Sequence, residues 1–288
     1  MTATGKLGIL NPLAIIFENH LARLGMVIIG IFILAALFAP WLAPHDPIAQ
    51  NLGQRLQPPS WTYPLGTDDL GRCVLSRMIH ATRISLRIGL LVVGITAISG
   101  SIIGLFSGYT GGITDELIMR ATDVFLAFPG IVLALVVAGV LGPGLTNTML
   151  ALALIGWTGY ARLVRGCVLS TREKTFVEAT QVLGAGHVYI MFRHILPEVL
   201  GPVLVMATLG MGWTILSSAA LSFLGLGAQP PVPEWGAMLS SGRPYLRTAW
   251  HLSTFPGLAI MVVVLAFNFL GDGLNDALNH KKKPADGN

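Results

Sequence analysis

Residues 178–197, EATQVLGAGHVYIMFRHILP, form a polar stretch between two long apolar segments at about 146–164 and 199–226. Glycine permits turn conformations, and proline cannot continue a preceding helix. Gly184 and Pro197 therefore predict a short helix, a glycine turn and a second short helix that ends or begins at the proline. From these residues alone, the stretch is either a handle that an external partner moves or an interfacial helix pair that merely connects two membrane spans.

The composition around this stretch indicates an integral membrane protein. Of the 288 residues, 53% are hydrophobic and 11% are charged, whereas soluble domains carry about 25% charged residues. The uncharged runs reach about 20 residues, the length of a helix that crosses a bilayer. A soluble protein with a large core would need charged faces between these runs, and the sequence lacks them. We expect an all-α protein with six transmembrane helices, at about 24–42, 86–106, 124–141, 146–164, 199–226 and 252–270.

The distribution of basic residues predicts the orientation. We expect an N-terminal segment at 1–23, a transmembrane domain at 24–280 and a polar tail at 281–288. Six spans place both termini on one side, and 11 of the 18 Lys and Arg residues fall on that side together with residues 178–197. Because cytoplasmic loops are enriched in Lys and Arg, both termini are expected to be cytoplasmic. The lysines at 281–283 are expected to contact anionic lipid.

Two local patterns modify this plan. Apolar residues between Leu70 and Ile79 recur at helical spacing among arginines, which predicts a separate amphipathic helix on the membrane surface before the second span. Pro129 and Gly130 fall inside the third predicted span and predict a kink there, which neighbouring helices in a membrane tolerate.

The sequence contains no recognisable motif for chemistry of its own. It lacks a GxxxxGK[ST] phosphate loop, an HExxH helix and clustered metal ligands. Charged residues are nearly absent from the predicted spans, so proton relays have little to work with. Cys73 and Cys167 lie far apart, and the histidines are scattered. We therefore expect no enzyme activity, no cofactor and no metal site in this chain, and the net charge of +4 requires no nucleic-acid partner.

The stretch at 178–197 resembles the coupling loop of permease subunits from ATP-binding-cassette importers. That loop has the pattern Glu-Ala-Ala, three residues, Gly, nine residues, Ile, one residue, Leu-Pro. Thr180 replaces the second alanine, and His194 stands where the general pattern has Ile. A histidine followed by Ile-Leu-Pro is similar to the oligopeptide, dipeptide and nickel branch. Five residues match the general pattern: Glu178, Ala179, Gly184, Leu196 and Pro197.

Other stretches are similar to the same branch and occur in the same order, so that the resemblance covers about residues 24–280. They are LGTDDLGR at 65–72, RISLRIG at 83–89, GYARLVRG at 159–166, SFLGLGAQPPVPEWGAML at 222–239, FPGLAI at 255–260 and AFNFLGDGLND at 266–276.

The resemblance implies a type I importer permease fold and a set of partners. The chain would pair with a second, homologous permease subunit and bind two ATPase subunits, which hold ATP and Mg²⁺. An extracytoplasmic substrate-binding protein would deliver the solute through the bacterial inner membrane. The implied ATPase-coupling residues are Glu178, Ala179, Gly184, His194, Leu196 and Pro197.

The substrate and the outer loops are left open by the sequence. The resemblance implies peptides as substrates, with nickel or a nickel chelate as the alternative. An ion-coupled secondary transporter and a membrane scaffold without transport are the other classes. The stretches 65–72 and 230–236 either dock the binding protein or only form turns. Three residues are candidate contacts for that protein: Glu234, Trp235 and Arg243.

Overall fold

The computed structural model describes residues 19–280, and in that range it contains helices and loops but no named strand, which confirms the all-α prediction. The tail at 281–288 and most of the N-terminal segment at 1–23 lie outside the described residues. The α-helices are α2 (His20–Leu37), α3 (Ala39–Leu42), α4 (Val74–Thr110), α5 (Gly112–Leu126), α6 (Gly130–Leu141), α7 (Leu145–Arg172), α8 (Thr175–Val182), α9 (His187–Ile190), α10 (Leu196–Phe223), α11 (Trp235–Gly242) and α12 (His251–His280).

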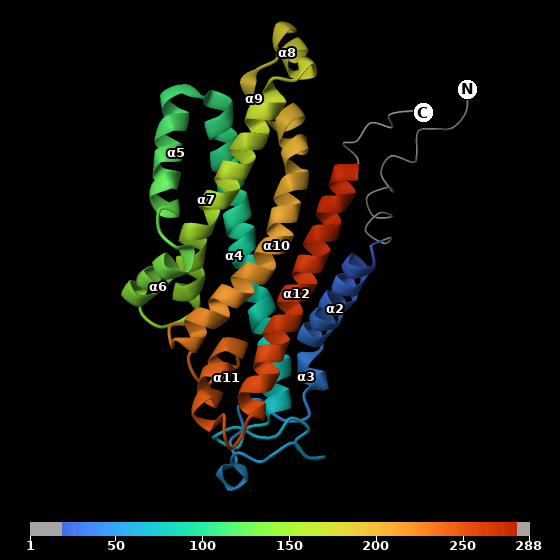
Figure 1. The fold of residues 1–288 in the computed structure, drawn as a ribbon, viewed down its shortest axis with the longest axis vertical. Coiled ribbons are helices and arrows are strands. Elements are labelled where there is room, and N and C mark those ends of the chain that lie inside the picture. Colours follow the sequence, from blue (N-terminus) through green and yellow to red (C-terminus); the bar gives the residue numbers. More distant parts are fainter. Residues whose placement is uncertain (1–18, 281–288) are drawn as a thin grey trace, which may run out of the picture.

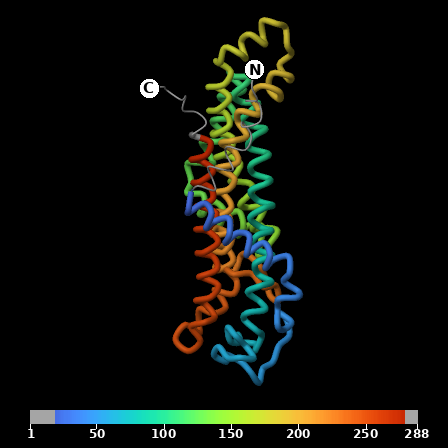
Figure 2. The backbone as a smooth tube through the Cα atoms, turned by 90° about the vertical axis from the view of Figure 1, so that its right-hand side faces the viewer, coloured from blue at the N-terminus to red at the C-terminus, as the bar shows by residue number. Residues whose placement is uncertain are grey.

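The long helices form an elongated bundle (Figure 1). Helix α4 packs against α7 and α10, α10 packs against α12, and α12 packs against α2. We call the end that carries α8 and α9 the upper end, and the opposite end, with α11 and the loop at 43–73, the lower end (Figure 1). The turned view shows that the loop with α8 and α9 projects beyond the upper end of the bundle (Figure 2).

Each of the six predicted spans falls on one of these helices. Within residues 19–280, four helices are long and apolar enough to cross a membrane: His20–Leu37, Val74–Thr110, His187–Phe223 and His251–Leu278. The bent pair α5–α6 makes a fifth candidate. Helix α7, with 28 residues, is also long enough but more polar, and it packs along α4 in the bundle.

Two local predictions need correction. The separate amphipathic helix before the second span is wrong, because α4 runs without a break from Val74 to Thr110. Its 37 residues span about 55 Å at 1.5 Å per residue, well beyond the hydrocarbon core. Arg77, which was expected on its surface, is buried. The kink near Pro129 is a break instead, because α5 and α6 meet at 86°.

Close packing of α4 on α7 makes this pair the rigid centre of the bundle. Gly100, Gly104 and Gly108 recur every fourth residue on the face of α4 that meets α7. A Cβ atom on Gly104 would lie 2.3 Å from the carbonyl oxygen of Ala161. Small residues at this spacing let two membrane helices approach closely, so the upper ends of α4 and α7 form one support for the loop above them.

Candidate functional site

The stretch predicted from the sequence forms the loop at the upper end. Helix α8 is followed by a turn, and α9 continues into a π-helical turn at Met191–Ile195 and then into α10. The predicted order of short helix, glycine turn and second helix is therefore present. Pro197 stands in the first turn of α10, where its missing N–H removes no helical hydrogen bond. The second helix thus does not stop at the proline but leads into the membrane helix.

Gly184 makes the turn between the two helices. Its φ of +81° lies in the left-handed region, which glycine adopts without steric strain. Its N–H donates to the carbonyl of Gln181 at 2.9 Å, and the N–H of Ala185 donates to the carbonyl of Thr180 at 3.2 Å. These bonds are typical of a glycine that ends a helix. The hydroxyl of Thr180 donates to the carbonyl of Phe176 at 2.7 Å, so the Ala-to-Thr replacement leaves no unpaired hydroxyl.

Buried apolar side chains anchor the loop to the bundle. Val177 of α8 and Ile190 of α9 are fully buried, and Ile195 is buried below them. They form one cluster with Val164 and Val168 of α7 and with residues of α4 and α10. A force applied to the loop therefore reaches three long helices through packed side chains, which move as a unit.

The opposite side of the loop exposes a set of large apolar side chains, which we call the upper patch. Val182 and Leu183 are 87% and 86% exposed, although this end of the chain lies beyond the apolar spans. Clusters of exposed apolar side chains on such a surface commonly mark a protein contact. The upper patch consists of Val182, Leu183, Val188, Tyr189 and Phe192.

Polar residues lie beside the upper patch. Glu178 and Ala179 are exposed on α8, and the Glu178 carboxylate makes no hydrogen bond or ion pair within residues 19–280. Because α8 has no side-chain cap, Glu178 does not cap its own helix. It lines a cleft with Arg172, Gln181 and His187. An unpaired carboxylate beside an apolar patch is suited to receive a basic side chain from a partner.

His194 supports the loop from its inner side. The imidazole lies against two aromatic rings, with its centroid 6.1 Å from that of Phe176 and 5.5 Å from that of Tyr189. Leu196 is half-buried next to it, and Pro197 is exposed. Hence the six residues predicted as a coupling set do lie on one loop, but Glu178, Ala179, Gly184 and Pro197 face solvent whereas His194 and Leu196 pack behind them.

Ion pairs between α5 and α7 were missed from the sequence. The guanidinium of Arg165 donates two hydrogen bonds of 2.6 Å to the carboxylate of Asp115, which also accepts from Ser107 of α4 at 2.5 Å. Arg162 pairs with Asp123 at 2.5 Å. The partners are 50 and 39 residues apart, and no local pattern relates such distant residues. These pairs tie the upper half of the broken span to the rigid α4–α7 centre.

The stretch 65–72 at the lower end folds around the carboxylate of Asp68. One oxygen accepts from the backbone N–H groups of Leu70 and Arg72, at 3.0 and 2.9 Å. The other accepts from Arg72 Nε at 2.7 Å and lies 3.5 Å from Arg77 Nε. Arg77 in turn donates to the carbonyls of Pro47 and Pro231, at 3.1 and 3.5 Å. Asp68 therefore joins two outer loops, so this stretch has a turn-forming role.

Two of the three candidate contacts for a binding protein are buried inside this chain. Glu234 is 1% exposed, and its carboxylate accepts from the N–H groups of Gly236 and Ala237 at 3.0 and 2.9 Å, which caps α11. Burial raises the pKa of this carboxyl group, and the two backbone hydrogen bonds lower it in part. Trp235 is 0% exposed, and its Nε1 donates to the carbonyl of Met78 at 3.3 Å. Their side chains hold α11 in place rather than face a partner.

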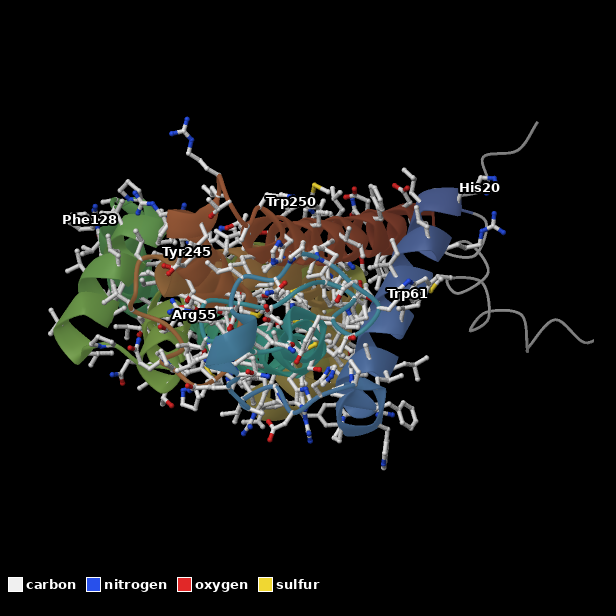
Figure 3. The ribbon with its side chains drawn as sticks, turned by 90° about the horizontal axis from the view of Figure 1, so that it is seen from below. His20, Arg55, Trp61, Phe128, Tyr245 and Trp250 are labelled. Carbon is white, nitrogen blue, oxygen red and sulfur yellow. The ribbon has the colours of Figure 1, made fainter. Side chains whose placement is uncertain are left out.

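Arg243 remains available, because its side chain is exposed and lies above the ring of Phe223. Figure 3 views this end from below and shows Arg55 and Trp61 on the loop at 43–73, with Tyr245 and Trp250 on the α11–α12 corner. The prediction of a binding-protein contact therefore stays open at Arg243 alone.

Replacing Glu234 by alanine is expected to lower stability by about 1–2 kcal/mol, because two N–H groups at the start of α11 lose their acceptor. Arg243→Ala, on the same corner, is the matched control and should leave stability within about 0.5 kcal/mol. The thermal unfolding midpoints of the purified variants measure both effects. Equal midpoints for Glu234→Ala and Arg243→Ala would contradict the capping role.

No group of three or more His, Cys, Asp or Glu side chains with the spacing of a metal site occurs within residues 19–280. The histidines found there have other neighbours. His45 stacks on Tyr63, and His251 is buried and lies 3.3 Å from the carbonyl of Thr67. This part of the chain thus provides no cluster that could hold nickel.

Comparison with solved structures supports the fold. The inward-facing methionine ABC transporter MetNI includes a chain that covers 70% of this chain and 97% of its own length, with a TM-score of 0.58 and 18% sequence identity. At this identity the likeness concerns the architecture alone. It confirms that the bundle has the permease fold of an importer of this class.

Comparison with curated proteins extends the likeness to the sequence. The di/tripeptide transport system permease protein DppC of Pseudomonas aeruginosa is 46% identical over 274 residues, which cover 93% of this chain and 90% of that protein. The dipeptide transport system permease protein DppC of Alkalihalophilus pseudofirmus is 47% identical, with 92% and 88% covered. The glutathione transport system permease protein GsiD of Escherichia coli is 45% identical, also with 92% and 88% covered.

Two family descriptions match the chain. The N-terminal transmembrane domain of oligopeptide transport permease C matches residues 13–59. The inner membrane component of binding-protein-dependent transport systems matches residues 100–284, which include the whole upper loop. With relatives of about 45% identity along nearly the full chain, these matches establish that the chain belongs to the family of inner membrane components of binding-protein-dependent transport systems.

Proposed function

We propose that this chain is the permease subunit of an ATP-binding-cassette importer and forms half of the translocation path for small peptides. The observation that carries this proposal is the upper loop, which combines an exposed apolar patch with a buried anchor. The patch is suited to bind a partner, and the anchor connects it to α4, α7 and α10. A chain without a nucleotide-binding motif needs such a connection to use ATP.

The partners follow from this arrangement and from the family. A second, homologous permease subunit completes the path, and two ATPase subunits bind the upper loops of the pair. ATP and Mg²⁺ are held by those subunits, and an extracytoplasmic binding protein delivers the solute at the lower end. The upper end and both termini face the cytoplasm of a bacterial cell, as the excess of Lys and Arg at that end supports.

The upper loop acts as a lever in this proposal. When ATP binding draws the two ATPases together, each pulls on the upper patch and on Glu178. Because Val177, Ile190 and Ile195 are packed against α7 and α4, the pull rotates these helices rather than the loop alone. The rotation converts an inward-facing path into an outward-facing one, a rigid-body transition around a packed interface.

Peptides are the substrate class that the relatives support. Permeases named for di/tripeptides, dipeptides and glutathione all share about 45% of their sequence with this chain. Nickel is not favoured, since the part of the chain described here has no three-ligand cluster. The short length of these peptides suits a path that one pair of subunits encloses.

Uptake measurements test the proposed function. The complete transporter is placed in proteoliposomes, with the binding protein and a labelled dipeptide on the outside and ATP inside. Uptake is expected to require ATP and to persist when an uncoupler collapses the proton gradient. Uptake that stops with the uncoupler at constant ATP would indicate a secondary transporter. Labelled Ni²⁺, which is expected not to enter, serves as the control for substrate class.

A further inference from the structure

A cavity of about 360 Å³ lies in the middle of the bundle, between α4, α7 and α10 on one side and the break between α5 and α6 on the other. Its volume is at the lower end of the range for ligand pockets, about 300–1,000 Å³. None of the described side chains that line it is charged. Val92, Leu152, Ile155, Met206, Leu209 and Trp213 supply much of its apolar surface.

The break in the third span creates this cavity. After Leu126 the chain turns by 86°, so α6 leaves the bundle instead of continuing along α10. Phe128, at the break, is 56% exposed and lies at the edge of the molecule in Figure 3. Gly130 faces the space that is left: a Cβ atom there would meet only the Trp213 ring, at 3.9 Å. Broken membrane helices are tolerated where they line a path or a cavity.

Tight helix contacts close the rear wall of the cavity. A Cβ atom on Gly156 would lie 2.8 Å from Thr96, and one on Gly210 would lie 2.8 Å from the Tyr160 hydroxyl. The cavity is thus a defined recess and not a general looseness of packing. Its open side is bordered by Gly130 and the half-exposed Trp213.

Few polar groups reach the recess. The hydroxyl of Thr96 is bonded to the carbonyl of Val92 at 2.9 Å, and the Tyr160 hydroxyl lies 3.4 Å from the carbonyl of Met206. Thr214 is 3% exposed, and its hydroxyl makes no hydrogen bond within residues 19–280. Such a lining disfavours the charged ends of a peptide or a lipid headgroup and favours an apolar group.

We propose that this recess receives an apolar side chain of the peptide during its passage, so that the permease itself contributes to substrate selection. The inference rests on the proposed peptide import. The peptide backbone and its charged ends stay in the path between the two permease subunits, and the side chain enters beside Trp213. Burial of a leucine- or phenylalanine-sized group in the recess is favourable because its apolar surface leaves water.

A pair of variants on α6 tests the inference. Gly130→Leu fills the recess, whereas Gly139→Leu adds the same side chain to an exposed position with no neighbour within 4 Å. Uptake of Leu-Leu and of Gly-Gly is measured with the complete transporter and one binding protein. We expect Gly130→Leu to lower the ratio of Leu-Leu to Gly-Gly uptake about tenfold, as expected when an apolar pocket is blocked. Gly139→Leu should leave the ratio unchanged.

Trp213→Ala provides an independent test, because it enlarges the recess without adding a side chain. Uptake of a tryptophan-containing dipeptide is expected to rise relative to Gly-Gly. If wild-type transporter imports both peptides and none of the variants changes a ratio, or if both peptides are affected equally, the recess holds a lipid chain or nothing and the inference is wrong. Failure of wild type to import either peptide would instead overturn the proposed function.

Discussion

Replacing Gly184 by valine is expected to uncouple ATP hydrolysis from peptide uptake while leaving the chain in the membrane. The φ of +81° at this position is a genuine outlier for a β-branched residue. A Cβ atom there would meet nothing within 4 Å, so the entire effect comes from the backbone. A strain of about 1–2 kcal/mol depopulates the observed turn roughly 5- to 30-fold, and uptake should fall by the same order.

Asparagine at the same position is the matched control. Asn tolerates the left-handed conformation far better than valine does and also ends helices. Gly184→Asn should therefore keep uptake close to that of the wild type. Uptake and ATP hydrolysis are measured on the same proteoliposomes, normalised to the amount of permease. Wild-type uptake by Gly184→Val at equal membrane levels would show that the turn is not needed for coupling.

The spans and the upper loop could be predicted because both depend on local sequence. About 20 uncharged residues can cross a bilayer in few ways other than as a helix. Gly184 and Pro197 act on their own backbone, so their effect is readable without knowing what lies nearby. The direction in which side chains of the loop face was not readable. His194 and Leu196 pack inward because Phe176 and Tyr189, distant by a turn or more, lie beside them.

The lower end could not be predicted because its burial depends on distant partners. The stretch PPVPEW reads as an exposed turn, yet Trp235 reaches the carbonyl of Met78, and a Cβ atom on Gly236 would lie 2.3 Å from the carbonyl of Ala219. Likewise, Arg72 and Arg77 suggested a surface helix because arginine is rarely buried unpaired. Their burial is possible because Asp68 lies between them.

Replacing Asp68 by alanine is expected to cause the largest loss of stability of any change proposed for this chain, about 3–5 kcal/mol. The carboxylate lies between the guanidinium groups of Arg72 and Arg77, and all three side chains are at most 11% exposed. Without it, two positive charges are left buried with only backbone carbonyls and Asp69 near them. The turn at 65–72 also loses the acceptor for the N–H groups of Leu70 and Arg72.

Asp69 is the matched control, because it is adjacent, has the same charge and also pairs with Arg72, but at 3.8 Å and with a side chain that is 30% exposed. Asp69→Ala should lower stability by less than about 1 kcal/mol. Asp68→Asn separates charge from hydrogen bonding: an amide oxygen can still accept from the backbone, so any remaining loss comes from the unneutralised arginines. Thermal unfolding midpoints and the amount of mature chain in the membrane measure these effects. Similar losses for Asp68→Ala and Asp69→Ala would mean that general negative charge, and not the position of one carboxylate between two buried arginines, holds the outer loops together.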